Sequence, residues 1–217
     1  MEKQLIVRKN RIINIIMKIF WIFVIGSIFG FFAEIIYGLI YTRNLAIRRG
    51  LIYGPFIQIY GIGALAYYIL ISKVKEPKKA FFLGMFIGGC LEYLCSFFQE
   101  LFFGTISWDY TTEFLNLNGR TCFIYCFYWG VIAVLYLKMV YPLLNRLDLV
   151  FEYSQMKILT ICLMIFLVFD IMISWMAGVR QHERRNSVPA NSVIDGFLDK
   201  YYTDAILNDI YNNNKEI

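Results

Sequence analysis

Three carboxylates interrupt long apolar stretches of this 217-residue chain: Glu34, Glu92 and Asp170. A charge near the centre of a bilayer costs about 2.5–3.5 kcal/mol on insertion scales, so each carboxylate needs a partner or water. One interpretation is functional: such groups line a path and select for charge, or do general acid–base work. The other is structural: each carboxylate pairs across helices and holds a bundle together.

The segment from Arg48 to Gly61 is unusual for a simple connection between apolar stretches. Its glycines permit positive φ, its proline can begin a helix, and its tyrosines suit a membrane interface. The functional interpretation is a loop whose free backbone amides and arginines hold an anionic group at a helix N-terminus. The structural interpretation is a turn that leads into the next apolar stretch. The candidate residues are Arg49, Gly50, Tyr53, Gly54, Pro55 and Tyr60.

A second unusual connection ends at Arg120, directly before an apolar stretch, and Asn118-Gly119 within it is a turn signal. At membrane depth Arg120 needs a counter-charge, which Asp109, Glu92 or Glu34 would supply. A Glu–Arg pair lining a polar cavity would explain both charges at once. The candidate residues of this connection are Trp108, Asp109, Tyr110, Asn116, Asn118, Gly119 and Arg120.

The remaining reactive side chains indicate no catalytic or metal site. All five cysteines lie in or at the ends of apolar stretches, without a CxxC pair, and the single histidine, His182, lies in a polar tail. This pattern predicts buried free thiols rather than a zinc site. Phosphate-binding loops, dinucleotide fingerprints, zinc-protease motifs and serine-hydrolase motifs are all missing from the sequence. We therefore assign no catalytic residue, no metal and no cofactor, and an enzyme is the weaker class.

Membrane-spanning helices must position these candidates. Hydrophobic residues make up 59% of the chain and charged residues 17%, against about 45–50% and about 25% in soluble domains. Mean hydropathy is +0.57. About twenty apolar residues cross the roughly 30 Å of hydrocarbon, and five stretches are long enough. We therefore predict an all-α, polytopic integral membrane bundle of about five transmembrane helices. The predicted spans are Ile15–Ile40, Ile52–Ile71, Ala80–Phe103, Cys122–Leu144 and Lys157–Gly178.

The charge distribution divides the chain and orients it. Residues 1–14 form a basic segment, 15–178 the bundle and 179–217 a polar tail. With the N-terminus in the cytoplasm, twelve of the 21 basic residues lie inside, which predicts that orientation in a bacterial cytoplasmic membrane. If one segment re-enters the membrane, we expect it to be Gly104–Thr121. The scattered basic residues argue against nucleic acid as a partner.

The tail is predicted to contain one amphipathic helix with an acidic outer face, which packs on the protein or on a partner rather than on anionic lipid. Its apolar residues are Val193, Ile194, Phe197, Leu198, Tyr201, Tyr202, Ala205 and Ile206, opposite Asp195, Asp199, Asp204 and Asp209. Glycine pairs at Gly26/Gly30 and Gly84/Gly88 permit close helix packing, and a homodimer would use one of these helices.

Several motifs in this order resemble the CmpB family, type IV ABC-transporter membrane proteins of bacteria. They are Arg49-Gly50-Leu51-Ile52-Tyr53-Gly54-Pro55 with Tyr60-Gly61, Leu91-Glu92-Tyr93, Trp108-Asp109-Tyr110, Asn116-Leu117-Asn118-Gly119-Arg120 and Trp129-Gly130. The order and spacing match from about Glu34 to Asp170, and the tail is also similar. The resemblance implies a permease that moves an unknown substrate with a separate ATPase subunit.

Two other classes of function stay open. A membrane-embedded enzyme acting on a lipid-linked or amphipathic substrate would use Glu34, Glu92 or Asp109 as acid or base. Arg49 or Arg120 would then hold a phosphate. A non-transporting sensor or partner protein would use the tail helix as its contact. In all three cases the partner that the sequence requires is the lipid bilayer.

Overall fold

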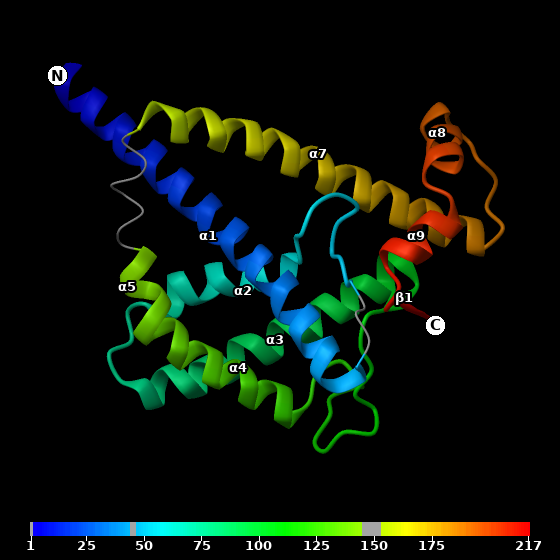
Figure 1. Cartoon of the computed structure of the whole chain (residues 1–217), viewed down its shortest axis with the longest axis horizontal. Coiled ribbons are helices and arrows are strands. Elements are labelled where there is room, and N and C mark those ends of the chain that lie inside the picture. Colours follow the sequence, from blue (N-terminus) through cyan, green and yellow to red (C-terminus); the bar gives the residue numbers. More distant parts are fainter. Residues whose placement is uncertain (1, 44–46, 145–152) are drawn as a thin grey trace.

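The computed structural model describes residues 2–43, 47–144 and 153–217, and most of them are helical (Figure 1). Within these residues four helices are long and apolar enough to cross a membrane. This confirms the prediction of an all-α helical membrane protein. The four are α1 (Glu2–Thr42), α3 (Pro77–Phe103), α4 (Phe123–Leu135) with its continuation through the π-helical turn η2 (Tyr136–Val140) into α5 (Tyr141–Leu144), and α7 (Ser154–Arg185).

The predicted span Ile52–Ile71 is only partly helical. Residues 51–57 are irregular, and the helical part consists of α2 (Gln58–Ala66) and the π-helical turn η1 (Tyr67–Ile71). Nine and five residues give a length of about 21 Å, less than the roughly 30 Å of hydrocarbon. The crossing therefore combines a loop with a short helix. Such backbone is tolerated at membrane depth only where protein satisfies its polar groups.

The helices pack as two close pairs, α1 with α2 and α3 with α4. A Cβ on Gly26 or Gly30 would overlap α2, and one on Gly84 or Gly88 would overlap Ala133 or Trp129 of α4. Both glycine pairs are thus used for packing within the chain. Because these faces are occupied, a homodimer would need another surface.

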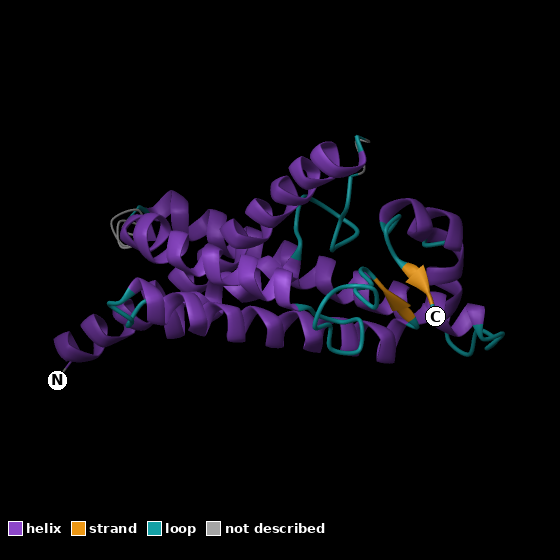
Figure 2. Ribbon diagram, turned by 90° about the horizontal axis from the view of Figure 1, so that it is seen from below, coloured by secondary structure: helices purple, strands orange, loops and turns teal. Residues whose placement is uncertain are grey.

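Two short strands and two short helices lie at one end of the bundle (Figure 2). Strand β1 (Thr105–Ile106) follows α3 and pairs antiparallel with β2 (Lys215–Glu216). This pairing ties the end of the tail to the end of α3.

The tail forms two helices, α8 (Val193–Tyr201) and α9 (Asp204–Ile210), instead of the single helix expected. Ser192 and Asp195 form a capping box that starts α8, and Thr203 caps α9, so the sequence contains two helix starts. Leu198, Tyr202 and Leu207 are buried in one cluster with residues of α7.

The expected orientation of the tail faces is wrong. Asp199 and Asp204 point inward and pair with Arg184 of α7, whereas Val193 and Ile194 are exposed. Leu198 and Tyr202 of the predicted apolar face are buried on the same side as Asp199, so the buried side combines residues from both predicted faces. The arginines of α7 decided this, because a buried arginine needs a carboxylate.

Candidate functional site

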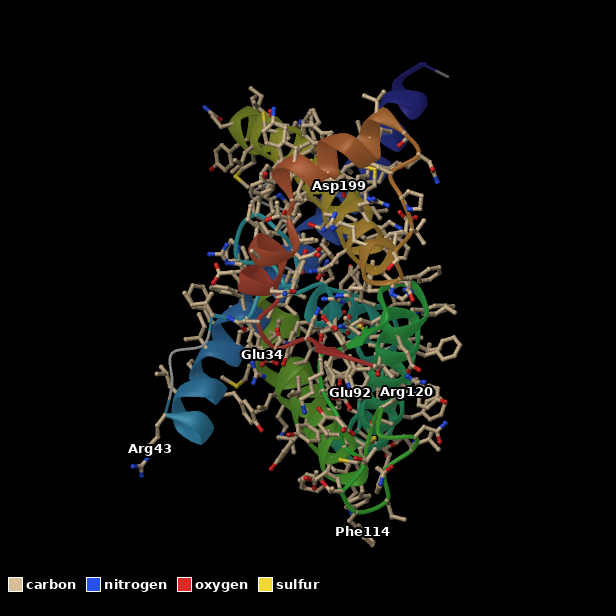
Figure 3. The ribbon with its side chains drawn as sticks, turned by 90° about the vertical axis from the view of Figure 1, so that its right-hand side faces the viewer. Glu34, Arg43, Glu92, Phe114, Arg120 and Asp199 are labelled. Carbon is tan, nitrogen blue, oxygen red and sulfur yellow. The ribbon has the colours of Figure 1, made fainter. Side chains whose placement is uncertain are left out.

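Two of the predicted carboxylates lie close together inside the bundle. Glu34 of α1 accepts hydrogen bonds from Tyr60 Oη at 2.7 Å and Arg48 Nη1 at 3.0 Å. Glu92 of α3 is buried and accepts a hydrogen bond from Thr121 Oγ1 at 2.9 Å. Tyr60 interacts electrostatically with both carboxylates, and Figure 3 shows both in the middle of the molecule. We call these five residues the carboxylate–tyrosine cluster.

Tyrosines from the loop after α3 and from α4 extend this cluster. Tyr110 stacks on Tyr125 with ring centroids 4.3 Å apart, and Tyr125 Oη lies 3.1 Å from Tyr37 Oη of α1. Burial raises the pKa of Tyr110, and the nearby Glu92 carboxylate raises it further. Tyr110 therefore stays protonated at neutral pH, as an uncharged group near the Glu92 carboxylate.

The cluster contains two carboxylates and one cation, Arg48, so it carries a net negative charge when both carboxylates are ionised. It can therefore attract a positively charged group or take up a proton. Shallow apolar hollows lie on the surfaces of α3, at Pro77 and Phe81, and of α1, at Phe32 and Ile36.

Asp170, the third carboxylate, holds the irregular loop 51–57. The side chain is fully buried, and its Oδ1 accepts hydrogen bonds from Tyr53 N at 3.1 Å and Ser174 Oγ at 3.2 Å. Ser174 Oγ in turn accepts a hydrogen bond from Ile52 N at 2.9 Å. We call Ile52, Tyr53, Asp170 and Ser174 the loop anchor. The amides of this loop do hold an anionic group, but the group is a carboxylate of the same chain.

The loop reaches the interior of the bundle from a second direction as well. Ile57 N donates to the carbonyl oxygen of Ser27, near the middle of the apolar part of α1. Gly54 has a φ of +76°, which favours glycine, and Pro55 lies within the loop, ahead of α2. Gly50 N donates to Phe56 O, which closes the base of the loop, while Arg49 is exposed. The irregular segment 51–57 thus packs against the middle of the apolar part of α1.

Arg120 pairs with a carboxylate that differs from all three expected ones. Its Nη1 lies 2.5 Å from Oε2 of Glu100, and its guanidinium lies over the rings of Tyr93 and Phe97. The neighbouring Thr121 reaches Glu92 instead. The successive residues Arg120 and Thr121 therefore point to different turns of α3, and a Glu92–Arg120 pair does not form.

The other candidates of this connection shape a turn. Asp109 is exposed and accepts from Thr111 N, and Trp108 Nε1 donates to Arg120 O. Asn116 Oδ1 accepts from Gly119 N, and Asn118 Nδ2 donates to Tyr93 Oη. These bonds hold Arg120 and Thr121 in position at the start of α4. These bonds join residues of the connection to one another and to Tyr93 of α3.

Sequence reasoning missed several partners. Ser174 follows Asp170 by four residues and so shares its helix face, a signal that was available. No sequence signal pointed to Thr121, Tyr37 or Tyr125. They are ordinary polar and aromatic residues, and only the packing of the helices brings them to the cluster. In the described part of the chain, no three His, Cys, Asp or Glu side chains are grouped so that they could hold a metal ion.

A charged network attaches the tail to α7. The guanidinium of the buried Arg180 binds both oxygens of Asp199, with Nε–Oδ1 at 2.9 Å and Nη2–Oδ2 at 3.0 Å. Arg184 Nη1 adds a bond to Asp199 at 2.7 Å, and Arg184 Nη2 binds Asp204 at 2.6 Å. Hydrogen bonds from Arg180 and, to a smaller extent, Arg184 lower the pKa of Asp199 to about 2.

This network should weaken in acid. Because the pKa of Asp199 is lower in the folded protein than its ordinary 3.8, its contribution to stability is present above about pH 4. It is lost as the pH falls from there toward 2. We expect the thermal midpoint of the wild type to fall more between pH 6 and pH 3 than that of Asp199→Asn, which cannot titrate. Equal losses in the two proteins would contradict this assignment.

Comparison with known proteins agrees with this arrangement. A family model described as "Putative ABC-transporter type IV" matches residues 21–175. The range contains the carboxylate–tyrosine cluster and the loop anchor and stops before the tail network. No curated protein and no solved structure matches the chain significantly. Because the family model covers well over half of the chain, and because the motifs seen in the sequence lie inside its range, the protein belongs to the CmpB family of ABC-transporter type IV membrane proteins.

Proposed function

We propose that the protein is a permease-like subunit of an ABC transporter in a bacterial cytoplasmic membrane, and that a separate ATPase chain drives it. Family membership and the four long apolar helices support this proposal. The sequence has no phosphate-binding loop of its own, so ATP hydrolysis must come from another chain.

The observation that carries the proposal is the carboxylate–tyrosine cluster. Glu34 and Glu92 come from two different helices and approach the same tyrosine in the interior. Ionisable groups in a membrane interior are expensive and generally mark a pathway. The excess negative charge of the cluster favours a substrate with a positively charged group over an anionic one.

The ATPase would dock at the end of the bundle that carries the exposed lysines 73, 75, 78 and 79. Lys73 and Lys75 lie between η1 and α3, and Lys78 and Lys79 lie in the first turn of α3. Ile71 shares a buried cluster with Leu144 at the end of α5 (Figure 1). Their positive charge favours the cytoplasmic side, which also places the N-terminus inside. The tail then lies on the opposite side of the membrane. A second candidate docking segment, Tyr141–Met156, falls partly outside the described residues.

The first experiment is purification of the tagged full-length protein from its native cell in a gentle detergent, followed by mass spectrometry. We expect an ABC ATPase subunit at stoichiometric level, and ATP hydrolysis by the complex in proteoliposomes. A protein that comes out alone, or only with partners that are not ATPases, would overturn the transporter proposal.

Glu92→Gln tests the path within that complex. Glutamine keeps the acceptor for Thr121 Oγ1 but removes the charge. We therefore expect the complex to assemble normally, while its rate of ATP hydrolysis falls at least several-fold. Glu113→Gln, in the exposed loop before α4, is the matched control and should leave hydrolysis unchanged. If Glu92→Gln assembles and hydrolyses ATP like the wild type, then the carboxylate is a structural hydrogen-bond acceptor only.

A further inference from the structure

Helix α8 presents an apolar face that no other described part of the chain covers. Val193 is 92% exposed, Ile194 56%, Phe197 48% and Tyr201 52%. We call these four residues the outer face of α8. The opposite side of the same helix is fully used, because Leu198 is buried and Asp199 binds the arginines of α7.

The attachment to α7 fixes the level at which this face lies. The apolar stretch of α7 is bounded by the charged residues Lys157 and Arg180. Its roughly 22 residues span about 33 Å, close to the thickness of the hydrocarbon core. Asp199 binds Arg180 itself, so the middle of α8 lies at the edge of the hydrocarbon. Figures 1 and 3 show α8 running across the end of α7, in the direction of a helix that lies along a membrane surface.

We propose that the outer face of α8 inserts into the interfacial layer of the bilayer, between the phospholipid headgroups and the acyl chains. Aromatic residues are enriched at this level, and Phe197 and Tyr201 form a ring pair there, with centroids 4.9 Å apart. Lys200 Nζ lies 4.9 Å from the centroid of the Tyr201 ring. At this level a long lysine side chain can keep its charge among the headgroups.

The charge on α8 favours lipid contact through apolar area rather than through anionic headgroups. The helix carries Asp195, Asp199 and Lys200, and Asp199 is already neutralised by the arginines of α7. No cluster of basic residues is present on the helix to attract negatively charged lipid. Insertion leaves every bond to α7 in place, so no polar group loses a partner. This inference does not depend on transport.

The test uses the full-length protein in phosphatidylcholine nanodiscs that contain a small fraction of phosphatidylcholine with a photoreactive group near the headgroup. After illumination, mass spectrometry locates the lipid adducts. We expect adducts on the outer face of α8, at a level that high salt does not change. In Val193→Asp/Ile194→Asp we expect these adducts to fall at least fivefold, while adducts on the lipid-exposed part of α7 stay constant.

The double variant should fold normally, since both side chains are exposed and aspartate is favourable in the first turn of a helix. Lys200→Gln is the matched control on the same helix and should keep the adducts. Three results would each overturn the proposal. The first is that lipid adducts form on α7 but not on α8. The second is that the adducts on α8 persist in the double variant. The third is that a stoichiometric protein partner covers the outer face of α8.

Discussion

Asp170→Ala is expected to lower the free energy of unfolding by about 2–4 kcal/mol, the range for buried polar groups that lose a partner. The change removes the acceptor of Tyr53 N and leaves the hydroxyl of Ser174 with one partner fewer. Water cannot replace it, because Asp170 is fully buried. We expect a lower thermal midpoint in detergent and a reduced yield of monodisperse protein.

Asp170→Asn separates hydrogen bonding from charge. Asparagine keeps one oxygen where Oδ1 accepts its two bonds, so most of the lost stability should return. Ser174→Ala also removes two bonds, the one from Ile52 N and the one to Asp170, and should likewise lower the thermal midpoint. If Asp170→Ala melts like the wild type, then Asp170 does not hold loop 51–57.

Gly88→Ala is expected to be comparably damaging for a steric reason. A Cβ at this position would overlap the side chain of Trp129 close to the α4 backbone, so α3 and α4 must separate. Overpacking of a tight core costs about 1–3 kcal/mol, and the bulk of the tryptophan puts this site at the upper end. We expect a clear fall in the thermal midpoint and a shift toward aggregated material in size-exclusion chromatography.

Gly196→Ala is the matched control, because a Cβ there meets nothing within 4 Å. It replaces a glycine inside α8, where alanine is favoured by up to about 1 kcal/mol. The thermal midpoint should therefore stay the same or rise slightly. Equal destabilisation by the two substitutions would argue that the contact between α3 and α4 does not explain the effect at Gly88.

These two sites explain different parts of the fold. Gly88 allows two long helices to meet at close range, which is how a membrane bundle gains packing contacts without a hydrophobic driving force between helices. Asp170 satisfies backbone amides of a loop that lies among the helices, which is the condition for irregular backbone in a bilayer. The carboxylate–tyrosine cluster depends on both, because Tyr60 and Glu92 are carried by α2 and α3.

The sequence by itself determined the long helices and the expensive residues inside them. Four of the five predicted apolar stretches form long helices, because a helix satisfies its own backbone polar groups in a membrane. The fifth, Ile52–Ile71, is helical only from Gln58 onward. The three carboxylates Glu34, Glu92 and Asp170 stood out because each places a charge, which is costly in a membrane, inside an apolar stretch. The family motifs were visible as well, because they are local in the sequence.

The partners of those residues were decided only by the tertiary structure. Tyr53 and Asp170 are 117 positions apart, and no local pattern links them. Arg120 binds Glu100 instead of Glu92 because the turn before α4 aims Arg120 and Thr121 at different turns of α3. Asp199 of α8 and Asp204 of α9 turned inward because two arginines of α7 needed carboxylates. Periodicity shows that a helix has two faces, but the charges packed against it determine which face is buried.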